Sequence, residues 1–262
     1  MIKRLVIVGA TAAVSAVSAI YFFQQRMIFP APKAVDPQHA DPRFRPVSIK
    51  TSDGEMLAGH FHPPELGEPT VVIFHGNGSA AVYQDLKGAA YAGAGMGVLL
   101  AEYRGYGLST GAPSEKGLFT DGVASFDFAR QHTDGPIGIH GHSLGTGVAV
   151  KVASVRDVFG IVLESPFDSV LAIAQKRFPW LPVSLFLKHK FRSDELIGSI
   201  HVPILILHGT EDAIVPFTHG VKLLERAPPL TQFVGVNGAG HNNLAEFGGL
   251  QQAVEFLRAA LL

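Results

Sequence analysis

The residues best suited to carry chemistry in this chain are Ser143, Asp212 and His241. A serine hydroxyl is a poor nucleophile until a base takes its proton, and that base must be oriented by a third group. Asp212 and His241 each follow an apolar run, and they come after Ser143 in the order serine, acid, histidine. That order is the one expected when the serine lies between a strand and a helix. We therefore predict that these three residues form a catalytic triad, although Glu164 or Asp168 could replace Asp212 as the orienting acid.

Ser143 is the centre of the pentapeptide 141–145, GHSLG. An apolar run at 136–140 precedes it and a run of small residues at 146–150 follows it. This pattern predicts a strand, a sharp turn and a helix. The flanking glycines are then needed where a Cβ would collide with the strand and the helix. A helix that begins at Leu144 would direct its free backbone N–H groups toward the serine.

A second backbone donor is expected in the loop after the first buried strand, 71–74. That loop reads HGNG at 75–78, and we assign the N–H of Asn77 as the partner of the Leu144 N–H in an oxyanion hole. Five further residues are expected to form the substrate pocket: His75, His142, Phe167, Trp180 and Val215. For Trp180, packing within the core of the cap is the alternative.

The same loop also permits a rival hypothesis. Residues 76–81 have glycines and an alanine at the spacing of a dinucleotide-binding turn, and Glu102 ends the next strand. That hypothesis leaves the three triad residues unexplained, so we expect no cofactor. Paired histidines at 60/62 and 140/142 have no third ligand at a suitable spacing, so we expect no metal either.

Composition limits the class of protein. The chain has 262 residues, a net charge of −1 and no cysteine, which gives no basis for nucleic-acid binding and excludes disulfides. Apolar runs alternate with helical patterns, which favours one α/β domain with a mostly parallel eight-stranded sheet and helices on both faces. The predicted strands are 47–49, 56–62, 71–74, 98–103, 136–140, 161–163, 204–208 and 232–236, with a cap inserted at about 169–200 after the sixth strand.

The N-terminus carries an uncharged apolar run from Leu5 to Phe23. Its 19 residues would span about 28 Å as a helix, close to the hydrocarbon thickness of a bilayer. We predict a membrane anchor at 1–28, an extended tether at 29–46 and the globular domain at 47–262. A slight excess of positive charge before the run puts the domain on the non-cytoplasmic side. A secretory signal cleaved after Ala19 is the alternative.

The chain resembles the α/β-hydrolase superfamily from about Phe29 to its C-terminus, and is most similar to membrane-anchored serine hydrolases of the α/β-hydrolase-domain and bud-emergence type. The segments that carry the resemblance are 75–78 (HGNG), 103–107 (YRGYG), 141–145 (GHSLG), 164–167 (ESPF), 180–182 (WLP), 208–212 (HGTED), Val215-Pro216 and Gly240-His241. The resemblance implies the α/β-hydrolase fold, with Ser143 as nucleophile, His241 as general base and then acid, and Asp212 as its orienting partner.

The expected activity is hydrolysis of a small-molecule or lipid acyl ester or thioester through an acyl-enzyme. Two alternatives stay open on the sequence alone. A peptidase or amidase would use the same triad, and a membrane-tethered binding protein would keep the fold without turnover.

Overall fold

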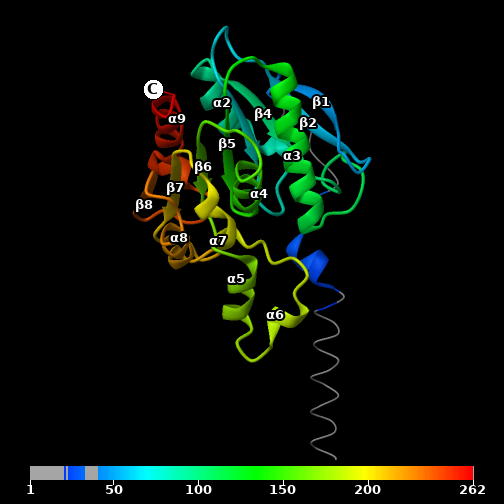
Figure 1. Ribbon diagram of the computed structural model, residues 1–262, viewed down its shortest axis with the longest axis vertical. Helices are drawn as coiled ribbons and strands as arrows, with labels where there is room; N and C mark the ends of the chain where they lie inside the picture. The colour runs from blue at the N-terminus through cyan, green and yellow to red at the C-terminus, as the bar shows by residue number, and fades with distance from the viewer. Residues whose placement is uncertain (1–20, 22, 33–40, 262) are drawn as a thin grey trace, which may run out of the picture.

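A central eight-stranded sheet organises the protein (Figure 1). The computed structural model describes residues 21, 23–32 and 41–261. The strands are β1 (Arg45–Lys50), β2 (Met56–His62), β3 (Thr70–Phe74), β4 (Gly97–Ala101), β5 (Ile137–His142), β6 (Ile161–Glu164), β7 (Ile204–Gly209) and β8 (Thr231–Val236). The α-helices are α2 (Asp85–Gly93), α3 (Glu115–His132), α4 (Leu144–Ala153), α5 (Val170–Arg177), α6 (Val183–Phe186), α7 (Ser193–Leu196), α8 (Phe217–Leu224) and α9 (Gly249–Ala259), and short 3-10 helices are η2 (Ala81–Gln84), η3 (Ile197–Ser199) and η4 (Leu244–Phe247).

The strand order is β1-β2-β4-β3-β5-β6-β7-β8. β1 and β2 form an antiparallel hairpin, β2 pairs antiparallel with β4, and every later pair is parallel. The predicted mostly parallel sheet is therefore confirmed. β3 lies between β4 and β5, so the chain crosses to the other side of β3 when it passes from β4 to β5. In parallel sheets the crevice at such a point, beyond the carboxyl ends of the strands, is where ligands bind.

The strands β3, β4, β6 and β7 are buried along their whole length, and helices cover both faces of the sheet (Figure 1). In β3, Val72 and Phe74 belong to the core cluster that contains Val148 of α4. Val71 and Ile73 belong to a second cluster on the opposite face, which contains residues of α2 and α9. This alternation fixes the face of the sheet on which each side chain packs. The parallel pairing brings the carboxyl ends of β3, β5, β7 and β8 to one end of the sheet.

The segment between β6 and β7 leaves the body and carries α5 and α6 (Figure 1). Ser169 and Arg192 form an isolated β-bridge at its base, and we call residues 169–192 the cap. The predicted insertion reached residue 200. In the structure α7 contacts α4, and Ile197 and Ile200 are buried in the core. The last part of the predicted insertion therefore packs as part of the body.

The N-terminal predictions fall largely outside the described residues, which include little of the anchor at 1–28. Residues 23–28 are helical. No helix in the described ranges combines the length and the apolar character that spanning a bilayer requires. Of the predicted tether, the structure describes 29–32 and 41–46. Phe29 and Phe44 are both buried in the core, so these parts of the tether pack against the body.

Candidate active site

Ser143 lies at the turn between β5 and α4 in a strained backbone conformation. Its φ is +50° and its ψ is −116°, outside the backbone regions that residues other than glycine prefer. The flanking glycines make the turn possible. A Cβ on Gly141 would lie 2.5 Å from the carbonyl oxygen of Gly145, and a Cβ on Gly145 would lie 2.1 Å from the carbonyl oxygen of Phe74. The Ser143 N–H donates to the carbonyl of Glu164 at 2.9 Å, which ties the turn to β6.

The structure brings the three predicted triad residues together. The Oγ of Ser143 is 2.8 Å from Nε2 of His241, and Nδ1 of His241 is 2.7 Å from Oδ2 of Asp212. When Nδ1 donates its proton to the carboxylate, Nε2 has a free lone pair to accept the serine proton. All three side chains are buried, between 6% and 9% exposed. The arrangement can therefore deprotonate an alcohol in a site with little access to water.

Asp212 is held as a carboxylate by its surroundings. Its Oδ1 accepts the backbone N–H groups of Ile214 and Val215 at 2.9 and 2.8 Å. Burial acts to raise its pKa, but interactions with His208 and His241 outweigh burial and lower the pKa below its ordinary value. The negative charge that would stabilise a protonated His241 is thus present at neutral pH.

Two backbone N–H groups are available for an oxyanion. Leu144 is the first residue of α4, so its N–H has no acceptor within the helix. Asn77 lies in the loop after β3, and it lines the same cavity as Ser143. The Tyr106 hydroxyl donates to Oδ1 of Asn77 at 3.1 Å, and the Tyr103 hydroxyl donates to the carbonyl of His75 at 3.0 Å. Two tyrosines of the YRGYG segment therefore brace the loop at residues 75–78, which we call the oxyanion loop after its predicted role.

Glu102 has a structural position that argues against the dinucleotide hypothesis. Its Oε1 is 2.6 Å from Nε2 of His75, and its Oε2 accepts the N–H of Ala81 at 3.0 Å. The carboxylate is 3% exposed. It links the end of β4 to the oxyanion loop and to η2, and it is not free to bind a ribose.

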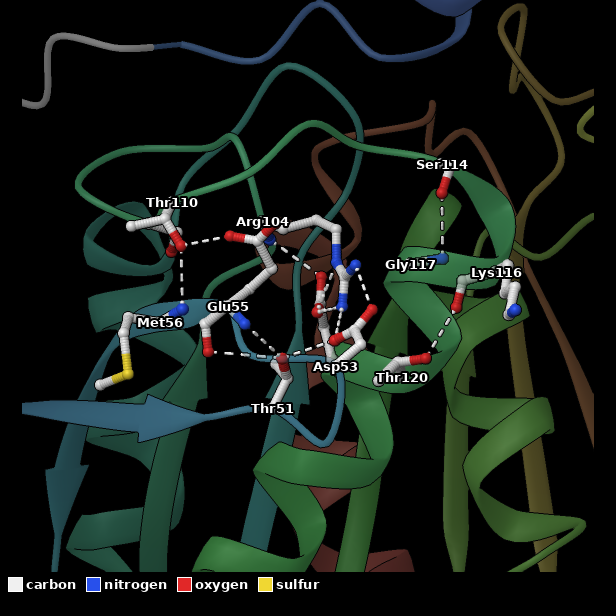
Figure 2. A network of polar contacts seen from close by, with 12 residues as sticks. Thr51, Asp53, Glu55, Met56, Arg104, Thr110, Ser114, Lys116, Gly117 and Thr120 are labelled. Carbon is white, nitrogen blue, oxygen red and sulfur yellow. Dashed lines mark hydrogen bonds and ion pairs between the residues drawn. The ribbon is translucent and has the colours of Figure 1, made fainter.

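Arg104 is at the centre of a second polar network (Figure 2). Its guanidinium makes two hydrogen bonds to Asp53, at 2.7 and 2.9 Å, and a third to Asp121 at 2.8 Å. Hydrogen bonds from Arg104 and Thr51 hold the pKa of Asp53 well below its ordinary value. These contacts join the β1–β2 turn, the end of β4 and α3, and none of them reaches the triad.

A cavity of about 420 Å³ is lined by Ser143, His241 and Asn77. Its polar lining includes His142, Lys87 and Glu164, and its apolar lining includes the exposed side chains Tyr83, Leu86 and Ile214. Nζ of Lys87 is 3.0 Å from Oε2 of Glu164.

His142 is the one predicted pocket residue that lines this cavity. Its Nε2 is 3.1 Å from the carbonyl oxygen of His241. Burial and the nearby Lys87 ammonium lower its pKa to about 3, so its ring is neutral at physiological pH. A neutral ring next to His241 adds no charge that would oppose protonation of the base.

The other predicted pocket residues lie elsewhere. His75, Phe167 and Val215 are buried in the body, and Phe167 packs against Phe191 in the core. Trp180 is 68% exposed on the cap. None of the four lines the cavity. Val215 contributes to the site through its backbone N–H on Asp212.

The alternative orienting acids have other partners. Glu164 contacts Nε2 of His140 at 3.0 Å, and Asp168 contacts Nδ1 of His219 at 2.5 Å. Within the described ranges, no group of three or more histidines and acids is placed to hold a metal ion.

A sequence-family profile and several known proteins match this chain. The sequence-family profile described as serine aminopeptidase, S33, matches residues 67–193. An uncharacterised protein of Mycobacterium tuberculosis is 35% identical over 248 residues, covering 91% of this chain and 87% of that protein. Alpha/beta hydrolase domain-containing protein 17C of Xenopus tropicalis is 35% identical over 203 residues, covering 74% of this chain and 63% of that protein.

Solved structures share the fold. An esterase of Pyrococcus furiosus superposes with a TM-score of 0.72 at 23% identity, covering 88% of this chain and 98% of the esterase. A monoacylglycerol lipase of Paleococcus ferrophilus superposes with a TM-score of 0.60 at 21% identity, covering 78% of this chain and 99% of the lipase. The sheet order, the strained serine turn and these relatives lead to one conclusion: the chain belongs to the α/β-hydrolase superfamily.

Proposed function

We propose that this protein hydrolyses small-molecule or lipid carboxylic esters or thioesters through an acyl-enzyme formed on Ser143. The observation that carries the proposal is the continuous relay from Oγ of Ser143 through His241 to Asp212, with both contacts under 3 Å. The names of the esterase and lipase that share the fold support a small ester as substrate.

In the proposed mechanism His241 accepts the hydroxyl proton as Oγ of Ser143 attacks the acyl carbon. The oxygen of the tetrahedral intermediate receives hydrogen bonds from the N–H groups of Leu144 and Asn77. Loss of one such donor typically costs about 2.7 to 4 kcal/mol of transition-state stabilisation. The imidazolium then protonates the leaving alcohol or thiol. Water, deprotonated by the same ring, releases the acid and restores the serine.

The test of this activity is hydrolysis of p-nitrophenyl esters by the purified full chain. We expect turnover by the wild type and none above background from Ser143→Ala. A folded wild-type protein without esterase or thioesterase activity on a panel of acyl lengths would contradict the proposal and favour the non-catalytic binding protein.

An aminopeptidase is the second candidate, because the matching family profile carries that description. Such an enzyme must bind the ammonium group of its substrate. Glu164 lines the cavity but is paired with Lys87 there, which favours the ester hypothesis. Parallel assays of an aminoacyl p-nitroanilide and the matching ester would separate the two, because an aminopeptidase would cleave the anilide at a comparable rate.

We also propose that residues 1–28 anchor the protein in a membrane, with the catalytic domain on the non-cytoplasmic side. The apolar run from Leu5 to Phe23 supports the anchor, and the positive charge of Lys3 and Arg4 supports the orientation. Retention of the full chain in the membrane pellet after alkaline carbonate washing is the expected result. Release into the supernatant would favour the cleaved signal instead.

A further inference from the structure

The cap and the helical residues 23–28 lie toward the same end of the molecule (Figure 1), and both carry large apolar side chains that are exposed. On the cap, Trp180 is 68% exposed and Leu185 is 77% exposed. On the helical residues beside it, Phe23 is 55% exposed and Met27 is 58% exposed. Side chains of this size normally pack in a core, so a grouped exposure of this kind points to a binding surface.

The two parts of this surface are joined. The Gln24 side chain donates to the carbonyl of Phe186 at 3.2 Å and accepts the N–H of Lys188 at 2.8 Å. Nζ of Lys188 lies 4.0 Å from the centre of the Tyr21 ring. A mostly apolar cavity between them is lined by Met27 and Ile28 on one side and by cap residues on the other. The exposed groups of the cap and of the helix therefore belong to one structural unit.

The cap itself carries only positive charges, and at its base the Glu115 carboxylate of α3 accepts the backbone N–H groups of Lys190 and Phe191. The cap contains Lys176, Arg177, Lys188, Lys190 and Arg192 but no aspartate or glutamate, and the first acidic residue of the whole chain is Asp36. Arg192 pairs with Asp194 just beyond the cap, whereas Lys176 and Arg177 are exposed beside Trp180. The protein as a whole has a net charge of −1, so its acidic residues lie elsewhere.

We propose that this surface, the cap together with residues 23–28, docks on the headgroup region of a lipid bilayer that contains anionic lipids. Tryptophan favours the membrane–water interface, and each lysine or arginine near an anionic surface contributes about 1 kcal/mol. The position of the apolar run from Leu5 to Phe23 favours a bilayer over a protein partner, because that run ends at Phe23 within the exposed set. The docking would hold the body in a fixed orientation on the membrane.

The chain offers a direct test because Trp180 is its only tryptophan. The full chain is reconstituted into phosphatidylcholine vesicles with and without phosphatidylglycerol, and Trp180 emission is recorded. We expect a blue shift, protection from acrylamide and quenching by brominated acyl chains, all stronger with the anionic lipid. An emission that stays unshifted and open to acrylamide in anionic vesicles would overturn the proposal, as would a blue shift that depends on protein concentration and not on lipid.

A charge variant sharpens the test. Lys176→Gln with Arg177→Gln removes two positive charges without placing negative ones at the C-terminal end of α5, where they would weaken the helix. The ratio of docked to undocked cap should fall about fivefold for each charge removed. The matched control is Arg45→Gln with Lys50→Gln on β1, which are also exposed but lie at the other end of the molecule (Figure 1). Equal losses in the two variants would contradict a docking surface on the cap. Neither readout depends on the proposed hydrolase activity.

Discussion

At the scale of single residues, the site depends on the placement of protons and charges within a few ångströms. The hydroxyl of Ser143 is not intrinsically reactive, and its reactivity would come from the lone pair of Nε2 on His241. That lone pair exists only while Nδ1 carries the proton, which the carboxylate of Asp212 ensures at 2.7 Å. The backbone groups of Ile214 and Val215 in turn fix the carboxylate.

We predict that Asp212→Asn lowers kcat for ester hydrolysis by about 10⁴-fold, the loss seen when a triad aspartate becomes an amide and stabilises the wrong tautomer. KM should change little, since the residue does not line the cavity. Steady-state kinetics measures kcat and KM separately, and thermal unfolding checks that the variant folds. A variant that retains most of its activity would identify another acid as the orienting group.

His142 gives a prediction on pH. Its pKa is about 3 in the folded protein against an ordinary value of 6.5. Between these values the unfolded chain binds a proton that the folded chain does not, so the free energy of unfolding falls as the pH falls. The slope from this group is at most about 1.4 kcal/mol per pH unit. His142→Gln should therefore lose less stability than the wild type when the pH drops from about 7 to about 4.5.

Urea unfolding at the two pH values measures this difference. His201→Gln serves as the control, because His201 is exposed and its loss should leave the acid sensitivity unchanged. An identical pH dependence for the wild type and His142→Gln would show that the neutral ring of His142 does not limit acid stability.

At the scale of elements, the loops after β3, β4 and β5 act together. The loop after β4 supplies two tyrosine hydroxyls, of Tyr103 and Tyr106, that bond to the oxyanion loop after β3. Because Asn77 is exposed at the end of that loop, its backbone N–H depends on such contacts to keep its direction. Pre-organised donors of this kind are what stabilise a developing oxyanion without reorganisation.

We predict that Tyr106→Phe lowers kcat about 3- to 10-fold with little change in KM, the effect of one lost hydrogen bond of about 1 kcal/mol on the position of a donor. Tyr91→Phe is the matched control. Tyr91 of α2 is as buried as Tyr106, and its hydroxyl bonds to His140. Its loss should affect stability without a comparable loss of kcat. An equal loss of kcat in both variants would assign the effect to general destabilisation.

Some features of this site could be predicted from the sequence and others could not. The strand–turn–helix of residues 141–145 and the mostly parallel sheet follow from local patterns, because glycine placement and strand burial are properties of short segments. The pocket lining does not follow from such patterns. Leu86, Lys87 and Ile214 line the cavity because of how α2 and the β7 loop pack, which depends on contacts between distant segments. Phe167 follows a strand and was expected in the substrate pocket, but its side chain is buried in the core.

At the scale of the whole molecule, Arg104 joins segments far apart in the sequence. It bonds Asp53 in the β1–β2 turn and Asp121 in α3, and it follows β4 (Figure 2). Asp121 is fully buried, so its charge depends on this partner. We predict that Arg104→Ala lowers the free energy of unfolding by about 3 to 5 kcal/mol, because it leaves a buried carboxylate without compensation.

Chemical denaturation of Arg104→Ala and of a matched surface variant measures the effect. Arg156 makes an equally short two-bond pair with Asp127, but both side chains are more than one third exposed. Arg156→Ala should cost at most about 1 kcal/mol. Similar losses in the two variants would mean that the Arg104 network contributes no more than a surface ion pair.

The most direct test of the central claim is the site at which a fluorophosphonate probe reacts with the folded full chain. The relay through His241 predicts one covalent adduct, located on Ser143 by peptide mass spectrometry, and no adduct in Ser143→Ala. An unlabelled wild type, or an adduct on a different serine, would contradict the assignment of Ser143 as the nucleophile.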